Sequence, residues 1–293
     1  MILTQQAGGV TFARTPEPEQ VTTQEPNVLE YDRVMSTKLA VDYAAALEII
    51  YRSRCVANGG TAADLCCGPG HYTLCLTRFL SFDVVKGFDL SPGMVEVANR
   101  NAADQGLAGH VEFRRGDVTR LKSIGDGAVD LASFTDAAHH MPDLSVVQAV
   151  LEEMDRITRP EGLIMVMDLV RLRTKALTQR YVNTLGHDYV ERGLPNFFDD
   201  FRNSMYAAWT APELFTAIPT KSRRWWCQLV PRGLPTVQFI LGLPVGRRKL
   251  FVRSGLPWSK EGNPVPREMR SEWRMLRASL RFASRHWVPP GAE

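Results

Sequence analysis

The chain has 293 residues, 44% of them hydrophobic and 23% charged, which fits one large globular domain or one domain with an elaborated end. No apolar run approaches the ~20 residues that a membrane span needs, and the N-terminus lacks the pattern of a secretion signal. The five cysteines form an odd set without paired metal-ligand spacing, so we expect reduced, mostly buried thiols, no metal site and a cytoplasmic protein.

The two ends of the chain differ in charge. Residues 1–27 are rich in Thr, Gln, Glu and Pro and lack apolar periodicity, which predicts a mobile tail. Residues 221–293 carry fifteen Lys and Arg against four Glu and no Asp, so the formal net charge of +3 is unevenly spread. This basic section either faces phosphates or an anionic lipid surface, or is an ordinary solvated face.

The stretch 61–73 is the most informative, and it follows an apolar stripe that predicts one helix over 28–54. An apolar run breaks at Gly68-Pro69-Gly70 and continues into a helix-like segment, 71–80, so strand, glycine turn and helix follow one another. Such a turn lets backbone N–H groups and a helix N-terminus approach a ligand. Asp89 ends a second apolar run, and a carboxylate there can accept both hydroxyls of a ribose. Together these features indicate a nucleoside-containing cofactor on a doubly wound sheet.

Further strands and helices alternate after Asp89. We expect helices over about 92–105 and 144–158 and strands over 111–115, 129–134 and 163–170. After residue 170, the pattern predicts a helix over 174–192, an irregular aromatic stretch over 193–225, strands over 225–230 and 236–243, and an amphipathic helix over 266–283 with a basic side.

Polar side chains follow the strand at 129–134. Asp136, His139 and His140 lie just beyond its carboxyl end, where ligands bind in an open parallel sheet. Either histidine could act as a general base, or it could be a cap or packing residue. Because they are adjacent on a loop, the two histidines are not expected to point the same way.

The glycine turn decides between cofactors. Thr73 stands where a dinucleotide fingerprint needs its third glycine, which disfavours a nicotinamide dehydrogenase. The stretch instead resembles motif I of class I S-adenosylmethionine (SAM) methyltransferases, acidic-x-x-x-Gly-x-Gly, with Asp64, Gly68 and Gly70 in the expected places. Further motifs follow in the family's order over roughly residues 28–170, and similar families include the ubiquinone/menaquinone-type methyltransferases.

This resemblance implies the fold, the cofactor and the division of the chain. The expected fold is α/β, a doubly wound, Rossmann-like sheet of seven strands with a helical cap after the fifth strand and an amphipathic C-terminal helix. The methyltransferase domain would span 28–243, with the cap at about 174–225, and residues 244–293 would form a basic extension. The cofactor would be SAM, and the product S-adenosylhomocysteine.

The resemblance also assigns roles to single residues. Asp89 would hold the ribose, Leu90 and Met94 would flank the adenine, and Asp117 with Val118 would take the adenine edge, although Asp117 could instead cap a turn. The residues expected to bind the cofactor are Asp64, Cys66, Gly68, Gly70, Asp89, Leu90, Met94, Asp117, Val118, Phe134 and Thr135. Those expected to serve catalysis are Tyr31, Asp136, His139 and His140. Tyr31 lies in a segment resembling one that closes over the pocket in many small-molecule methyltransferases, or it packs under a helix.

Three kinds of function agree with these patterns. The first is methyl transfer to O, N or C of a small metabolite, which mainly requires the protein to position a nucleophile near the sulfonium methyl. The second is methylation of RNA, guided by the basic C-terminal section. The third is a non-catalytic SAM-binding partner protein. The substrate, the accepting atom and the oligomeric state do not follow from the sequence.

Overall fold

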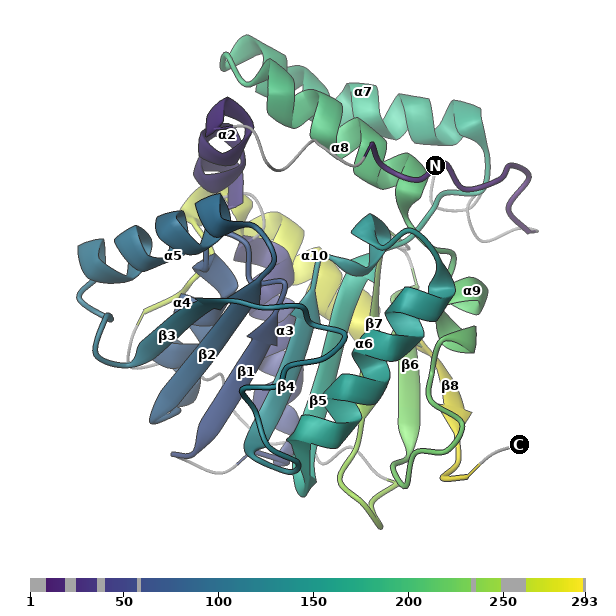
Figure 1. The fold of residues 1–293 in the computed structure, drawn as a ribbon. Helices are drawn as coiled ribbons and strands as arrows, with labels where there is room; N and C mark the ends of the chain where they lie inside the picture. Colours follow the sequence, from purple (N-terminus) through teal and green to yellow (C-terminus); the bar gives the residue numbers. More distant parts are fainter. Residues whose placement is uncertain are drawn as a thin grey trace.

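The computed structural model describes residues 9–18, 25–35, 40–56, 59–232, 236–248 and 262–291. They form an α/β fold around an eight-stranded sheet of order β3-β2-β1-β4-β5-β7-β6-β8 (Figure 1). The first five strands of that order are parallel, and β7 and β8 run antiparallel to their neighbours. The strands are β1 (Thr61–Leu65), β2 (Val84–Asp89), β3 (Val111–Arg115), β4 (Val129–Thr135), β5 (Thr158–Leu169), β6 (Trp226–Val230), β7 (Val237–Gly242) and β8 (Ser284–Val288).

The predicted fold class is confirmed, but the predicted number of seven strands is wrong. The additional strand, β8, pairs antiparallel with β6, which would otherwise be an unpaired edge. The run Ser-Arg-His-Trp-Val mixes polar and apolar residues, and only two of its five side chains are exposed. This run therefore lacks the regular alternation that predicts a strand. It becomes one because the edge of β6 offers unpaired backbone groups.

Helices cover both faces of the sheet. The described helices are α2 (Glu25–Met35), α3 (Ala40–Ser53), α4 (His71–Leu80), α5 (Pro92–Asp104), α6 (Leu144–Ile157), α7 (Lys175–Glu191), α8 (Pro195–Ala207), α9 (Ala211–Thr216) and α10 (Arg270–Arg281). One core packs α3, α4, α5 and α10 on the sheet, and a second packs α6 and α9 on the other face. No helix within the described ranges is long and apolar enough to cross a membrane.

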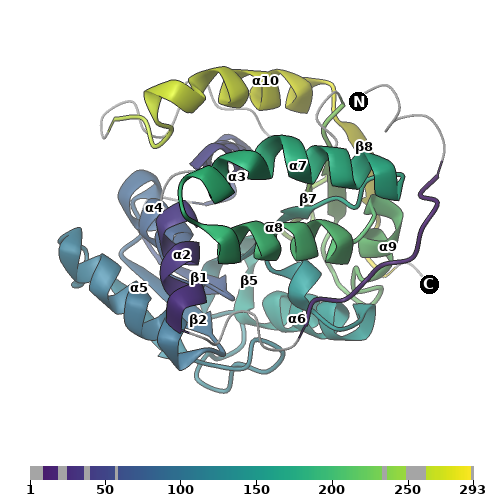
Figure 2. The same ribbon diagram turned by 90° about the horizontal axis from the view of Figure 1, so that it is seen from above.

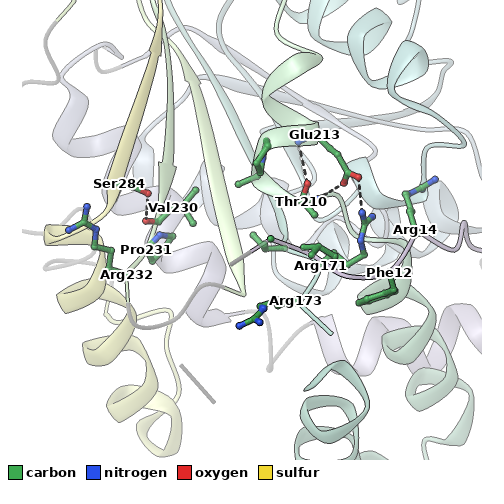
Figure 3. Close-up of a pocket in the computed structure, with 16 residues that line it drawn as sticks. Phe12, Arg14, Arg171, Arg173, Thr210, Glu213, Val230, Pro231, Arg232 and Ser284 are labelled. Atoms are coloured by element: carbon green, nitrogen blue, oxygen red, sulfur yellow. Dashed lines mark hydrogen bonds and ion pairs between the residues drawn. The ribbon is translucent and has the colours of Figure 1, made fainter. Parts of the chain in front are cut away.

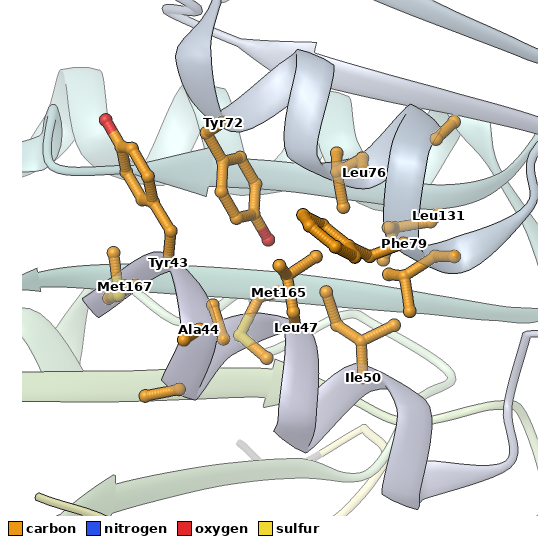
Figure 4. Packing of buried hydrophobic residues seen from close by; sticks show 14 of the residues in the cluster. Tyr43, Ala44, Leu47, Ile50, Tyr72, Leu76, Phe79, Leu131, Met165 and Met167 are labelled. Atoms are coloured by element: carbon orange, nitrogen blue, oxygen red, sulfur yellow. The ribbon is translucent and has the colours of Figure 1, made fainter. Parts of the chain in front are cut away.

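The first core shows why the apolar stripes fold onto the sheet. Figure 4 shows side chains of α3 and α4 packed together with side chains of β4 and β5; the labelled ones are Tyr43, Ala44, Leu47, Ile50, Tyr72, Leu76, Phe79, Leu131, Met165 and Met167. Leu47 and Leu76 are fully buried, and burial of such a side chain contributes about 1.5–3 kcal/mol. The basic helix α10 joins this core through Trp273 and Leu276, while its Arg277 pairs with Glu48 of α3.

Two helical predictions need correction. The single helix expected over 28–54 is two helices, α2 and α3, on either side of residues 36–39, which lie outside the described residues. The irregular aromatic stretch contains α8, in which Phe197, Phe201 and Met205 recur every four residues on one side. Together α2, α7 and α8 lie over the end of the sheet (Figure 2).

An N-terminal segment also lies on the domain. Residues 9–18 belong to the stretch expected to be a mobile tail, and they have defined contacts in the structure. The Thr11 N–H donates to the Arg173 carbonyl and the Thr15 N–H to the Tyr206 carbonyl. We call residues 9–18 the N-terminal strap. Residues 1–8 and 19–24 of the expected tail lie outside the described residues.

Candidate functional site

The predicted glycine turn joins β1 to α4 with a left-handed backbone. Gly68 has φ 51° and Gly70 has φ 83°, a region that favours glycine. A Cβ on Gly70 would lie 2.7 Å from Phe113 Cζ, so the turn packs against β3 too closely for any side chain. By contrast, among the described atoms only Tyr31 Cε1 would lie within 4 Å of a Cβ on Gly68. Its distance would be 3.7 Å. Space remains beside Gly68 for a ligand.

Asp89 faces this turn from the end of β2. Its Oδ2 accepts the Gly68 N–H at 2.9 Å and its Oδ1 accepts the Ser91 N–H at 2.9 Å. Burial raises the pKa of the carboxyl, which these backbone N–H groups counteract. A carboxylate has about four acceptor positions, so both oxygens can still accept ribose hydroxyls. The geometry fits the predicted role of Asp89.

Two of the predicted cofactor residues lie inside the fold. Asp64 is 1% exposed and accepts hydrogen bonds from Thr73 Oγ1 at 2.6 Å and Ser133 Oγ at 3.1 Å. Burial raises its pKa to about 7 despite these bonds. Phe134 is fully buried in the second core. In this structure Asp64 holds the start of the turn through α4 and β4, and Phe134 packs under the site.

The other predicted cofactor residues lie around the same edge of the sheet. Leu90 is 64% exposed beside Asp89, whereas Met94 is buried against Val28 and Val97. Asp117 Oδ1 accepts from the backbone N–H and the hydroxyl of Thr119, so the alternative role as a turn cap is present. The remaining members are Cys66, which is half-buried at φ 59°, and the buried Val118 and Thr135.

A cavity of about 540 Å³ adjoins these strand ends. It lies under α7 and α8 and beside α2, α3 and α10, and all four predicted catalytic residues line it: Tyr31, Asp136, His139 and His140. Most of the lining is aromatic or apolar, including Tyr181, Tyr189, Phe197 and Phe201. Because Tyr31 also lies beside Gly68, the glycine turn and this cavity meet at one side chain.

His139 is fixed by a partner that the sequence did not indicate. Its Nδ1 lies 2.5 Å from Oδ1 of Asp168, a fully buried residue of β5. The carboxylate accepts a hydrogen bond from Nδ1–H, and in that tautomer the free lone pair of the ring lies at Nε2. This hydrogen bond fixes the orientation of the His139 ring.

His140 pairs with the N-terminal strap. Its Nδ1 lies 2.5 Å from Glu17 Oε2, and Glu17 also accepts from Ser204 of α8. Burial alone would lower the His140 pKa, but the Glu17 carboxylate outweighs it and raises the pKa to about 9. Burial alone would likewise raise the Glu17 pKa, yet His140 lowers it to about 2. His140 is therefore a charged group near neutral pH.

The expectation that the two histidines point in different directions is wrong. Both line the cavity, and their ring centroids are 4.1 Å apart at a tilt of 44°. They occupy a single 3₁₀ turn, Ala138–His140, and bond to different acids, Asp168 and Glu17. Two separate carboxylates hold the neighbouring rings on the same side of the turn.

Glu17, His139 and His140 also form the kind of set that can hold a metal ion, with ligand atoms within 4.8 Å of one another. Spacing along the chain could not reveal this set, because Glu17 is distant in sequence. The direct contact between Glu17 and His140 is shorter than the roughly 3 Å that separates two ligand atoms around a metal with bonds of ~2.0–2.2 Å. We interpret the group as the ion pair of Glu17 and His140 beside the ring of His139.

A second pocket lies on the other side of the strap. Figure 3 shows its four arginines, Arg14, Arg171, Arg173 and Arg232, with Glu213 as the acidic residue among those that line it. Arg171 is 3% exposed and pairs with Glu213 at 2.7 Å. Arg14 lies over the Trp209 ring and donates to four backbone carbonyls, those of His139, Met141, Pro142 and Ala207. Through Arg14, the strap is thus hydrogen-bonded to the backbone of the turn that contains the two histidines.

The fold and the glycine turn define an α/β domain with a site for a nucleoside-containing cofactor, and comparisons with known proteins agree. Residues 62–162 match a family model described as a methyltransferase domain. A demethylmenaquinone methyltransferase of Leptospira interrogans is 29% identical over 110 residues, which cover 38% of this chain and 43% of the relative. A demethylmenaquinone methyltransferase of Staphylococcus aureus is 26% identical over 153 residues, which cover 52% of this chain and 61% of the relative.

One solved structure shares the fold. It is a putative SAM-dependent methyltransferase of Methanococcus maripaludis, with a TM-score of 0.53 and 20% identity, covering 81% of this chain and 99% of its own. The chain spans about half the length of the curated relatives it matches. Residues 62–162 thus match a methyltransferase domain, and the predicted resemblance to class I SAM methyltransferases, with SAM as the family's cofactor, is confirmed.

Proposed function

We propose that this protein transfers a methyl group from SAM to a small molecule held in the 540 Å³ cavity. The observation that carries this proposal is the position of Tyr31, which lies beside Gly68 of the cofactor turn and also lines the cavity. A cofactor at the turn and a second molecule in the cavity would meet at this residue. Relatives named as demethylmenaquinone methyltransferases support a small-molecule acceptor.

In this proposal the cofactor lies against the turn at Gly68 and the carboxylate of Asp89. The space beside Gly68 and the free acceptor positions of Asp89 suit a nucleoside with its ribose hydroxyls. When bound, SAM supplies an electrophilic methyl group on a positively charged sulfur. The helices α7 and α8 form the cap that separates the cavity from water.

His139 is the proposed general base. Asp168 orients the ring and stabilises the imidazolium that forms when Nε2 takes a proton from the acceptor. A base is needed only where the attacking atom carries a proton at neutral pH. Tyr31 and the aromatic lining position the acceptor, and positioning alone contributes a large part of catalysis.

The surroundings favour a small acceptor over a polynucleotide. The cavity is lined by residues of α2, α3, α7, α8 and α10 and by residues at strand ends, which suits a compact molecule. The basic helix α10 uses Arg277 in an ion pair with Glu48 and packs on α3. All five cysteines are free thiols, which supports the proposed cytoplasmic location.

The first test is binding and turnover with the purified full chain. Calorimetry should give micromolar affinity for SAM and S-adenosylhomocysteine and none for NAD, and a metabolite panel with methyl-labelled SAM should yield a labelled product. Binding of NAD without SAM would contradict the proposal.

The second test concerns the base. Once an acceptor is known, His139→Ala should lower kcat by about 10²–10⁴-fold with little change in SAM affinity. Asp168→Asn should also lower kcat, because the amide can hold the wrong tautomer of His139. Normal turnover in both variants would leave catalysis to positioning alone.

A further inference from the structure

The cavity contains an unusual concentration of carboxylates. Asp42 of α3, Asp136 after β4, Asp200 of α8 and Glu272 of α10 all line it. No Lys or Arg is among its described lining residues. The four acids come from four separate elements, so the tertiary fold gathers negative charge around a mostly aromatic space.

Two of these acids are buried with unused hydrogen-bonding capacity. Asp136 is 7% exposed, and its Oδ2 has no hydrogen-bond partner among the described residues. Asp200 is 6% exposed, and its Oδ1 likewise finds no partner in the described part of the chain. A buried carboxylate oxygen without a partner is costly, and such groups normally meet a donor or a cation.

The electrostatics of the acids agree with this picture. Burial raises the pKa of Asp200 to about 6, although His140 lowers it in part. Burial and the nearby Glu272 raise the pKa of Asp42 to about 7, and burial with the charge of Asp42 raises that of Asp136. Burial disfavours the ionised form of each of these carboxylates, and the positive charge of His140 offsets this only in part for Asp136 and Asp200.

The nearby basic groups do not fully compensate these carboxylates. His140 has its Nδ1 on Glu17, and the Arg14 guanidinium donates to carbonyls behind the histidine turn. The other arginines near the strap line the second pocket (Figure 3). The positive charge at the cavity is that of His140, and its pair with Glu17 offsets it.

We propose that the acceptor of this methyltransferase is an aromatic or apolar amine whose ammonium group is held by the buried acids Asp136 and Asp200. This rests on the proposed function, and it names the substrate class of that same site. The ammonium supplies the donors that Asp136 Oδ2 and Asp200 Oδ1 lack. The rings of Tyr189, Phe197 and Phe201 surround the organic part and attract the positive charge through their faces.

A matched pair of probes tests this assignment. Tyramine carries an ammonium group that 4-ethylphenol lacks, and both have the same phenol ring. Each is titrated by calorimetry into the full chain saturated with S-adenosylhomocysteine. Tyramine should bind at least 10-fold more tightly, and Asp200→Asn should remove most of that preference.

Asp199→Asn is the control, because Asp199 is an exposed neighbour on α8 that pairs with Arg202 and does not line the cavity. It should keep the preference of the parent protein. Equal binding of the two probes, tighter binding of 4-ethylphenol, absence of binding by both, or an unchanged preference in a folded Asp200→Asn variant would each overturn the amine assignment. If the parent protein does not bind S-adenosylhomocysteine at all, this result would instead contradict the proposed function.

Discussion

The ion pair between Glu17 and His140 gives the N-terminal strap a measurable stability. Replacing Glu17 by Gln removes the carboxylate that raises the His140 pKa and leaves an uncharged side chain of nearly the same shape. Burial of the ring, which lowers the pKa, is then opposed only by the smaller contributions of Asp200 and Asp168, so the His140 pKa should fall from about 9 toward 6.5.

The size of the effect follows from the pKa change. A rise from 6.5 to about 9 corresponds, at about 1.36 kcal/mol per pKa unit, to roughly 3 kcal/mol. The matching fall of the Glu17 pKa from 4.5 to about 2 describes the same pair and is not added. Since the His140 side chain is 26% exposed, we expect the ion pair to contribute about 2–3 kcal/mol to the free energy that holds the strap on the domain.

The sign of the pH dependence differs for the two partners. The raised His140 pKa stabilises the attached strap fully below about pH 6.5, and this stability is lost as the pH rises through about 9. The lowered Glu17 pKa stabilises it above about pH 4.5, and this stability is lost as the pH falls through about 2. The strap is therefore held most firmly between about pH 4.5 and 6.5.

Two measurements check this prediction near pH 6. Titration by NMR reports the His140 pKa, and limited trypsin cleavage after Arg14 reports detachment of the strap, which should rise about 30- to 150-fold in Glu17→Gln. Glu191→Gln is the control, because Glu191 lies beside His187 in an exposed pair on α7. An unchanged His140 pKa in Glu17→Gln would refute the reasoning.

Three further predictions concern the cofactor turn and the surface. Asp89→Ala should weaken SAM binding by roughly 10- to 150-fold in calorimetry, since a hydrogen bond to a charged group contributes about 1.5–3 kcal/mol, and an unchanged Kd would place the ribose elsewhere. Gly70→Ala should lower the free energy of unfolding by about 1–3 kcal/mol because its Cβ meets Phe113, whereas Gly93→Ala in α5, with nothing nearer than Ser91 Oγ at 3.8 Å, should be neutral or stabilising by up to ~1 kcal/mol. Methyl transfer to the true acceptor should vary little between low and physiological salt, and a loss of several decades in activity would favour a polynucleotide substrate.

Local signals predicted the first half of the sheet closely. The glycine turn, the strand before it and the helix after it could be predicted because Gly68, Gly70 and the apolar runs determine the backbone conformation of the residues next to them. The predicted strand at 61–66 is β1, Thr61–Leu65, and the predicted helix at 71–80 is α4, His71–Leu80. Tyr31, Asp136, His139 and His140 were predicted to serve catalysis from their positions near strand ends or in a motif. The structure places all four on one cavity, and their catalytic role stays a prediction.

Contacts between distant segments were not predictable in this way. The β8 strand was missed because its edge partner, β6, lies more than fifty residues earlier, and its own side chains alternate too weakly to indicate a strand. The helix α8 was missed because its many aromatic residues made the stretch look irregular, and the sequence did not show whether they pack in the core or in a cap over the substrate. In each case packing against another element decides a conformation that the local residues leave open.

The sequence by itself determined the class of fold, the glycine turn and the edge of the sheet at which we place the proposed site, since these depend on glycine conformations and on hydrophobic periods of a few residues. The tertiary structure decided which acids meet which histidines: Asp168 behind His139, and Glu17 of the strap on His140. It also decided that Asp200 faces the same cavity as Asp136. Side chains from 29 to 123 residues apart meet only through folding, and their charges then act on one another because burial removes the water that would screen them.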